Sequence, residues 1–339
     1  MQPQIRIDSP ATISEKEIEQ HLSKGEQVII QFVAKDYTGK ILDKLNELCA
    51  KYDDNFRIRF YGHYGDSFDC NVVNHLPNVK ALAVDCLIKA HNIEAITRLT
   101  NLQRLTVGIY EIKETELLSA ENLQQVKELF LIDTKTKAFN LEFLSNYRNL
   151  TSLIISGHTK NIDAVGTLTK LNSLRLNSIS KAPLHFVNGL KELKFLSITL
   201  GGRDNIYEIG ENEIEHLELV WIRGLNDISN MGNFRKLQTL KVEDQIRLPD
   251  IHFDRELPEL HDLKLLNCKT LTSLSGLEKL PALEKLRIYK TNVDFEQFIQ
   301  QPLPPLLKVL AFYTTKNKVD AQLRARLKSM GYTDGLKGN

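Results

Sequence analysis

The stretch 259–289, ELHDLKLLNCKTLTSLSGLEKLPALEKLRIY, contains one apolar phrase twice. Its spacing L-x-x-L-x-L recurs after 23 residues, where Leu260, Leu263 and Leu265 return as Leu283, Leu286 and Ile288. A unit this short holds one strand and one tight return segment, and it cannot enclose a hydrophobic core alone. The stretch therefore predicts repeats that stack on copies of themselves.

The same phrase occurs eleven times, at intervals of 21 to 24 residues. Its first position is occupied by Val79, Leu102, Val126, Leu150, Leu171, Leu193, Ile214, Leu237, Leu260, Leu283 and Leu307. The fourth position is Leu in every copy, and the sixth is always apolar. This alternation predicts a strand with one buried face in each repeat, so positions one, four and six should point into the core.

The pattern resembles the leucine-rich repeat over residues 76–315, and phrases such as LTSLSGLEKLPALEKL resemble the short repeats of internalins and of certain phosphatase regulatory subunits. The resemblance implies an α/β solenoid, in which a curved parallel sheet forms the concave face and short helical or irregular segments form the convex face. The ninth position departs from the family, which usually carries Asn or Cys there to bond the turn backbone. Only Cys268 fits, whereas residues such as His158 and Gln245 do not. We therefore expect an irregular solenoid of about 11 repeats.

The two ends of the chain lack the repeat. Residues 1–75 predict a βαβαβ-like cap, with helices opened by Ser14 and Thr38 and a last strand that continues the solenoid sheet. Residues 316–339 predict a C-terminal capping helix from about Val319 to Met330, capped by Asn317 and followed by a tail that frays after Thr333. The helix should bury one apolar face, made of Leu323, Leu327 and Met330.

Composition excludes several classes of protein. Lys and Arg number 44 and Asp and Glu number 43, so no overall field attracts the chain to nucleic acid or to an anionic membrane. The beginning of the sequence contains no signal peptide, and no stretch reaches the roughly 20 apolar residues that span a bilayer. We expect a cytoplasmic protein, although delivery to a host cell stays open.

Motifs for catalysis are missing from the sequence, which has no phosphate loop, no dinucleotide fingerprint and no HExxH. The loop 61–70, YGHYGDSFDC, holds His63, Asp66, Asp69 and Cys70, but their spacing matches no zinc pattern, and its two glycines favour a surface turn. We predict that the protein is not an enzyme and binds no cofactor and no metal.

Positions three, five and seven of each phrase should line the open face of the sheet, which is the usual docking surface of a solenoid. Two groups on this face match the composition of binding hot spots, one apolar in the middle and one aromatic and basic toward the C-terminal end. The residues expected to contact a partner are Phe130, Ile132, Ile154, Arg175, Phe195, Trp221, Lys241, Lys264, Arg287, Tyr289 and Tyr313.

We therefore predict a monomeric, non-catalytic protein-interaction module that binds a partner protein through its concave face. No membrane is expected as a partner, and nucleic acid is not the expected one. The alternative is recognition of a glycan or a nucleic acid by the aromatic and basic C-terminal half of that face. A phosphatase-type regulator, a toxin-immunity partner and a delivered effector all remain open as roles.

Overall fold

The computed structural model describes residues 3–33, 35–62, 67–135, 139–180 and 182–336. The chain forms two compact units, 1–170 and 171–339, and each is described here by itself. In both units every repeat contributes one short strand to a parallel sheet, followed by a return segment built mostly of 3-10 turns. No described helix has the length and apolar character needed to cross a membrane.

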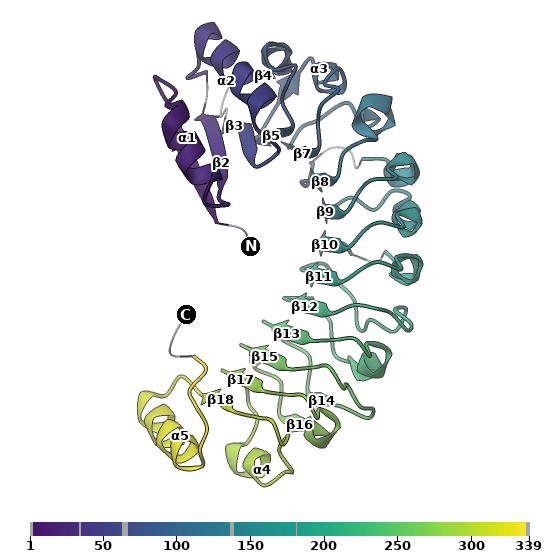
Figure 1. Cartoon of the computed structure of the whole chain (residues 1–339). Helices are drawn as coiled ribbons and strands as arrows, with labels where there is room; N and C mark the ends of the chain where they lie inside the picture. The colour runs from purple at the N-terminus through teal and green to yellow at the C-terminus, as the bar shows by residue number, and fades with distance from the viewer. Residues whose placement is uncertain (1–2, 34, 63–66, 136–138, 181, 337–339) are drawn as a thin grey trace. The chain divides into compact units, whose positions relative to one another are not determined.

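The first unit begins with the cap and continues into the first repeats. Its elements are β1 (Gln4–Asp8), α1 (Glu15–Leu22), β2 (Gln27–Val33), α2 (Gly39–Lys51), β3 (Phe56–Tyr61), β4 (Phe68–Asp69), η1 (Cys70–His75), β5 (Ala81–Leu87), β6 (Ala90–His91), α3 (Glu94–Thr97), β7 (Arg104–Ile109), η2 (Leu117–Ser119), η3 (Glu121–Leu123), β8 (Glu128–Leu131), η4 (Leu141–Asn146), β9 (Ser152–Ser156) and η5 (Ile162–Thr167). Figure 1 shows α2 and α3 on one side of its strands.

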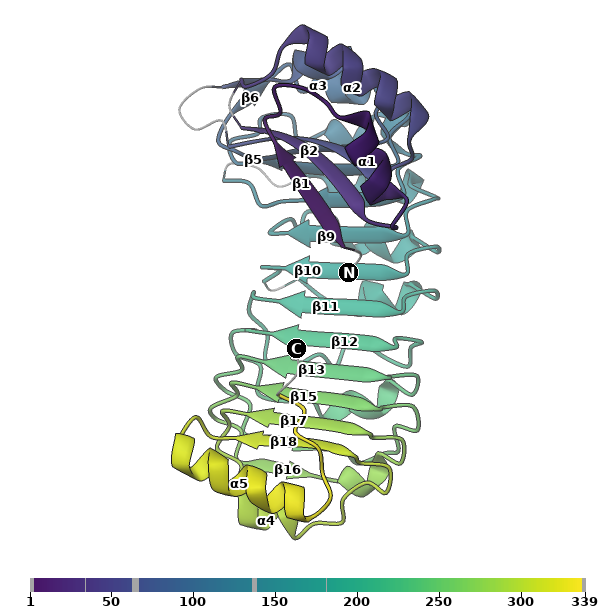
Figure 2. The ribbon, with the colours of Figure 1, turned by 60° about the vertical axis from the view of Figure 1, so that its left-hand side comes forward.

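The second unit consists of the later repeats and the C-terminal helix. Its elements are β10 (Ser173–Asn177), η6 (His185–Gly189), β11 (Phe195–Thr199), β12 (His216–Val220), η7 (Ser229–Asn233), β13 (Thr239–Glu243), β14 (Asp250–His252), β15 (Asp262–Leu266), β16 (Ser273–Ser275), η8 (Leu277–Lys279), β17 (Lys285–Tyr289), α4 (Phe295–Ile299), β18 (Val309–Tyr313) and α5 (Asn317–Ser329). Figure 2 shows its strands as parallel arrows, with α5 beside β18.

Each strand pairs with its neighbour at equivalent positions of the phrase. Leu240, at the fourth position, lies opposite Leu217 on β12 and Leu263 on β15, and the same match holds along the second unit. Residues at positions one, four and six are buried in all eleven copies, which confirms the predicted register. The core of each unit is therefore a set of leucine rows that run across the strands.

The N-terminal residues have the strand and helix order β1, α1, β2, α2, β3, and their sheet is continuous with that of the repeats. The Ser14 and Thr38 hydroxyls accept hydrogen bonds from Glu17 N and Ile41 N, so both residues cap helices. Strand β3 pairs in parallel with β5, the first strand of the repeats. The apolar flank of the first repeat is thus covered by three strands that extend the same layer.

The C-terminal prediction is wrong in three details. Asn317 is the first residue of α5 rather than its cap, and the buried Asp320 carboxylate instead accepts hydrogen bonds from the backbone N–H groups of Thr314 and Thr315. Met330 is exposed, so it does not belong to the buried face of the helix. Residues beyond Thr333 do not fray within the described range, because Asp334, Gly335 and Leu336 return over the sheet.

The structure also corrects the interpretation of the ninth position of the phrase, where only Cys268 was expected to bond the turn backbone. The His158 imidazole accepts a hydrogen bond from Phe139 N at its Nδ1 (3.1 Å) and lies 2.9 Å from the Ile132 carbonyl at its Nε2. The buried Gln245 amide donates to the carbonyls of Leu219 and Glu243, as Cys268 does to those of Val242 and Leu266. His158 and Gln245 therefore satisfy turn carbonyls in the manner the family assigns to Asn or Cys.

We predict that Leu240→Ala destabilises the protein by about 2 to 5 kcal/mol, because it opens a cavity in a fully packed leucine row. The change is measured as the free energy of unfolding in urea. Lys264→Ala, on the opposite face of the neighbouring strand, serves as the control and should stay within about 0.5 kcal/mol of the wild type. Equal effects from the two substitutions would contradict the assigned register.

A second prediction concerns pH. Burial lowers the pKa of His158 below its ordinary value of 6.5, and Phe139 N–H requires an unprotonated Nδ1. His158 is therefore protonated more readily in the unfolded chain than in the folded chain. The free energy of unfolding consequently decreases as pH falls from 6.5 toward the lower folded-state pKa of His158. His158→Asn should remove this part of the pH dependence in urea titrations between about pH 7.5 and pH 5.5. An identical slope of the free energy of unfolding against pH in the wild type and the variant would exclude this contribution of His158.

Candidate functional site

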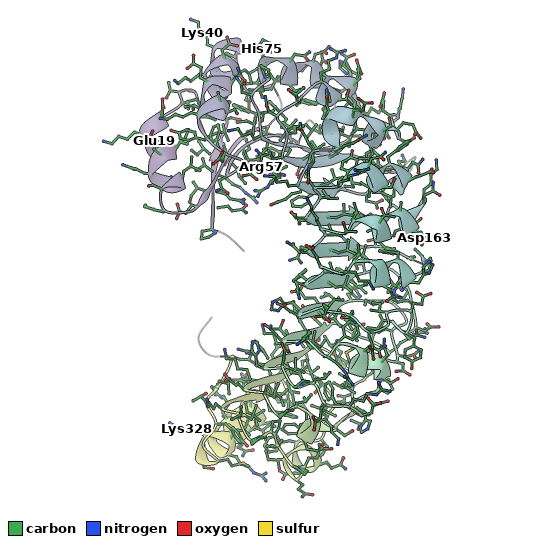
Figure 3. The ribbon with its side chains drawn as sticks, turned by 45° about the vertical axis from the view of Figure 1, so that its right-hand side comes forward. Glu19, Lys40, Arg57, His75, Asp163 and Lys328 are labelled. Carbon is green, nitrogen blue, oxygen red and sulfur yellow. The ribbon has the colours of Figure 1, made fainter. Side chains whose placement is uncertain are left out.

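In each unit the described return segments between the strands lie on one face of the sheet and leave most of the other face open. In Figure 3 the Arg57 side chain lies on this open side of the first unit, whereas His75 and Asp163 lie on the side of the return segments. The alternating burial of β8, β10, β12, β13 and β15 has the same origin, because every second residue contacts the core and the others remain partly exposed. Any partner that meets the sheet directly must meet this face.

The open face of the first unit is partly closed by arginines. Arg57 and Arg59 extend from β3 across β5, where the small Ala81 and Ala83 lie opposite them and leave room. Arg57 reaches the Thr106 hydroxyl on β7, two strands away. Both alanines are consequently fully buried, although positions three and five were expected to be open.

These arginines belong to a polar network with fixed partners. Arg59 binds Asp85 at 2.7 Å and the Gln31 side chain at 3.0 Å. Arg104, the next arginine along the face, pairs with Glu128 at 2.8 Å. Such charge-assisted bonds hold the guanidinium groups in one geometry.

Arg57 is the exception in this network. Among the described residues no carboxylate lies within 4.0 Å of its guanidinium, and its Nε has no hydrogen-bond partner. Burial lowers the pKa of Arg57 to about 10, and the adjacent Arg104 and Arg59 add to the effect against a rise caused by Asp85. A half-buried arginine without an anionic partner is a point where a carboxylate or another acceptor from outside would gain binding energy.

Sequence reasoning missed Arg57 and Arg59 because residues 1–75 were treated as a cap only. The signal was present in the alternation of Phe56, Ile58 and Phe60, which are buried. Since successive side chains of a strand point to opposite faces, the intervening arginines had to lie on the open face. The cap therefore supplies part of the surface that the repeats present.

The predicted apolar group is only partly brought together. Phe130 and Ile154 lie directly opposite each other on β8 and β9, and Ile132 follows on the same face with 37% of its surface exposed. Phe195 lies in the second unit, where the Arg175 guanidinium lies over its ring at 4.2 Å. The apolar patch of the first unit thus consists of Phe130, Ile132 and Ile154.

Ion pairs organise the open face of the second unit. Lys241 contacts Glu243 at 2.5 Å instead of the neighbouring Glu218, which lies 3.4 Å from Arg175. Lys264 lies 3.6 Å from Asp262, and Asp262 also binds Arg287 at 2.6 Å. The basic side chains of the predicted aromatic and basic group are therefore largely paired with carboxylates of this face.

The C-terminal tail covers part of the predicted aromatic and basic group. Arg287 donates from its Nε to the Gly335 carbonyl at 3.0 Å, and the Tyr313 hydroxyl donates to Asp334. A methyl group on Gly335 would come within 2.4 Å of Val309, so the tail packs closely on the sheet. Of the predicted aromatics, Tyr289 remains 37% exposed, and Trp221 lies in the turn after β12.

The described residues of the loop 61–70 support neither a metal site nor a nucleophilic cysteine. His63 and Asp66 lie outside the described residues. Asp69 caps η1 through Asn71 N and accepts from the Asn92 amide, and burial raises the pKa of Cys70 to about 12, which disfavours a thiolate. Within the described ranges, no three His, Cys, Asp or Glu residues are arranged to hold a metal ion.

Comparisons with known proteins bear on the fold. No protein-family model matches the sequence, and no curated protein matches it. An internalin from Listeria monocytogenes superposes with a TM-score of 0.57 at 16% identity, covering 92% of this chain and 87% of that chain. TLR13 in a complex with ssRNA gives a TM-score of 0.38 at 12% identity, covering 92% and 54%. A leucine-rich-repeat protein from Leptospira interrogans gives 0.36 at 14%, covering 84% and 90%.

Of these three superpositions, that of the internalin supports an argument, and at 16% identity it concerns the fold alone. Together with the parallel strands, one to a repeat, it shows that the chain is a leucine-rich-repeat solenoid. The resemblance inferred from the phrase L-x-x-L-x-L is thereby confirmed.

We predict different costs for two neighbouring arginines. Arg57→Met loses one hydrogen bond to Thr106 but also removes a half-buried charge without a carboxylate, so the free energy of unfolding should change by less than about 1 kcal/mol. Arg59→Met leaves Asp85 without its partner and should cost about 1 to 3 kcal/mol. Urea denaturation of both variants measures the difference. A larger loss for Arg57→Met would show that the fold, rather than a partner, requires this residue.

Proposed function

We propose that the chain is a non-catalytic interaction module that binds a partner protein through the open face of its sheet. The observation that carries the proposal is the apolar patch of Phe130, Ile132 and Ile154, which lies beside a preorganised polar network. The core does not require these side chains on this face, because positions one, four and six already fill it. An exposed apolar centre with a polar rim matches the anatomy of protein interfaces.

The rim is defined by residues adjoining the patch. Thr106 lies opposite Phe130, and Glu128, two residues before Phe130, pairs with Arg104. Arg57 lies next to these groups through its bond to Thr106. A protein segment with an apolar side chain and a nearby carboxylate would fill the patch and supply the acceptor that Arg57 lacks.

The remaining predicted contacts, Arg175, Phe195, Lys241, Lys264 and Tyr289, form a second set on the open face of the other unit. Their charges are paired within the face, which favours a role in specificity over one in affinity. Arg287 and Tyr313 contact the tail, so recognition of a glycan or nucleic acid by this end of the face loses two of its residues. The protein partner is therefore preferred for the open face.

The proposal predicts that Phe130→Ser combined with Ile154→Ser weakens partner binding at least about tenfold, because the apolar centre loses most of its buried area. The immobilised chain first captures the partner from lysate of the source cell, and mass spectrometry identifies it. Calorimetry then gives its Kd for wild type, for the double variant, and for Val220→Ser as an apolar-to-serine control on the second unit.

Thermal unfolding of all three proteins checks that the fold is retained, which we expect since none of the three side chains fills the core. Loss of binding in the double variant alone supports the patch. Equal affinity in the double variant and the wild type would reject it.

A further inference from the structure

A hollow of about 780 Å³ opens at the edge of the second unit, in the turns that follow β10, β11, β12 and β13. Its lining includes Trp221, Arg203, Arg223, Arg247 and Asp204. A smaller hollow of about 240 Å³ adjoins it, because Trp221 lines both, and Lys269 lines the second. This site lies outside the open face proposed above, since its residues belong to the turns and not to the strands.

The cations of this edge form a row. Arg203, Arg223 and Arg247 come from three consecutive repeats. Arg223 and Arg247 are exposed, and no carboxylate in the described part of the chain lies within 4.0 Å of either guanidinium. Their charges are thus available, unlike those of the lysines on the open face, which are paired.

Arg203 is the most buried member of the row. Only 9% of its side chain is exposed, and its Nε has no hydrogen-bond partner. The guanidinium donates to the Ala182 carbonyl at 3.1 Å, and the nearest carboxylate, that of Glu208, lies 3.9 Å away. A buried guanidinium that is satisfied so incompletely is expected to gain from an anion in the hollow.

Trp221 is the second feature that the fold does not explain. It is the only tryptophan of the chain, 58% of its surface is exposed, and its φ is +48°. The equivalent eighth position is also left-handed in other repeats, so this conformation belongs to the turn. The residues that occupy it there are Cys86, Gly157, Ser178, Leu200, Asp244, Asn267 and Lys290. What the turn does not explain is the large indole with 58% of its surface exposed, and an exposed aromatic side chain beside arginines matches the composition of binding sites.

The glycines of the hollow, in contrast, are explained by the backbone. Gly201 has φ +77°, and a Cβ there would lie 2.6 Å from the Ile179 carbonyl oxygen. Gly224 has φ +98°, and its Cβ would meet Asp204 at 3.0 Å. The unexplained residues are therefore the tryptophan and the arginines.

We propose that this hollow binds a segment of single-stranded nucleic acid, with a base stacked on Trp221 and phosphates on the arginines. Arginines on successive repeats suit a linear polyanion, because a guanidinium group can bind phosphate in a bidentate manner. A free indole face suits an unpaired base, whereas a duplex offers no exposed base face to it.

Asp204 distinguishes a nucleic acid from an acidic peptide. Asp204 lines the same hollow, and its carboxylate repels the anions of either ligand, but the side chains of a polyacidic peptide offer it no hydrogen-bond donor. The exocyclic amino group of a base can instead donate a hydrogen bond to such a carboxylate. The mixed lining therefore fits a ligand that carries both anions and amino donors, which is the chemistry of a nucleotide strand.

The test uses the full chain and a fluorescein-labelled single-stranded DNA of mixed sequence, about ten nucleotides long, together with the RNA of the same sequence. Binding is followed by anisotropy of the label and, independently, by quenching of Trp221, which is the only indole in the protein. Three phosphate contacts predict that affinity falls about 20-fold between about 50 mM and 200 mM salt. A preference for RNA or for DNA identifies the source of the strand without changing the site.

The variants separate the site from general charge. Arg223→Ala and Arg247→Ala should each reduce the slope of log affinity against log salt by about 0.7, because each removes one phosphate contact. Arg235→Ala removes an equal charge from an exposed arginine of the same unit outside the hollow, and its slope should equal that of the wild type. Trp221→Asn should lose at least about fivefold in affinity without a lower Tm, because Asn accepts the left-handed backbone.

Three results would overturn the proposal. One is the absence of anisotropy change with either strand at low salt. Another is unchanged affinity in Trp221→Asn together with unchanged salt slopes in the two arginine variants. The third is equal affinity for a polyglutamate peptide of the same charge, which would assign the row of arginines to acidic proteins.

Discussion

The pairing of equal positions in successive strands is the constraint on which the structure depends. Leu240 lies between Leu217 and Leu263, and a slip of one residue would turn every leucine of a strand onto the open face. The same slip would bury the charged side chains that alternate with them. The register of strand pairing thus determines both which side chains fill the core and which side chains lie on the open face.

The repeat pattern predicts this arrangement well because it depends on local spacing. Burial at positions one, four and six follows from the spacing of the phrase, whereas the continuation of the sheet from β3 to β5 was predicted from the order of strands and helices in the cap. At the ninth position, however, a prediction based on the family's residue types alone is too restrictive. His158 and Gln245 do not match the family's residue types, yet each presents a hydrogen-bond donor at the place where a turn carbonyl needs one.

The state of the open face could be predicted less well, because it depends on side chains that come from distant parts of the sequence. Ala83 was expected to be exposed, and it is buried beneath the arginines of β3. Arg287 was expected to be free, and it binds Gly335, which is 48 residues away in the chain. Spacing identifies the face on which a residue lies, whereas the length and branching of its neighbours decide whether solvent reaches it.

The C-terminal tail has a consequence beyond the residues that it covers. A parallel sheet that ends in an unpaired strand offers its backbone to any other chain, which promotes aggregation. Thr333 pairs with Val309 and its carbonyl accepts from Leu310 N, so the outer margin of β18 is already occupied. At the other end β1 carries Arg6 and Asp8, and charged side chains on a terminal strand discourage edge-to-edge growth. Each terminal strand thus carries a feature that disfavours pairing with the edge of another sheet.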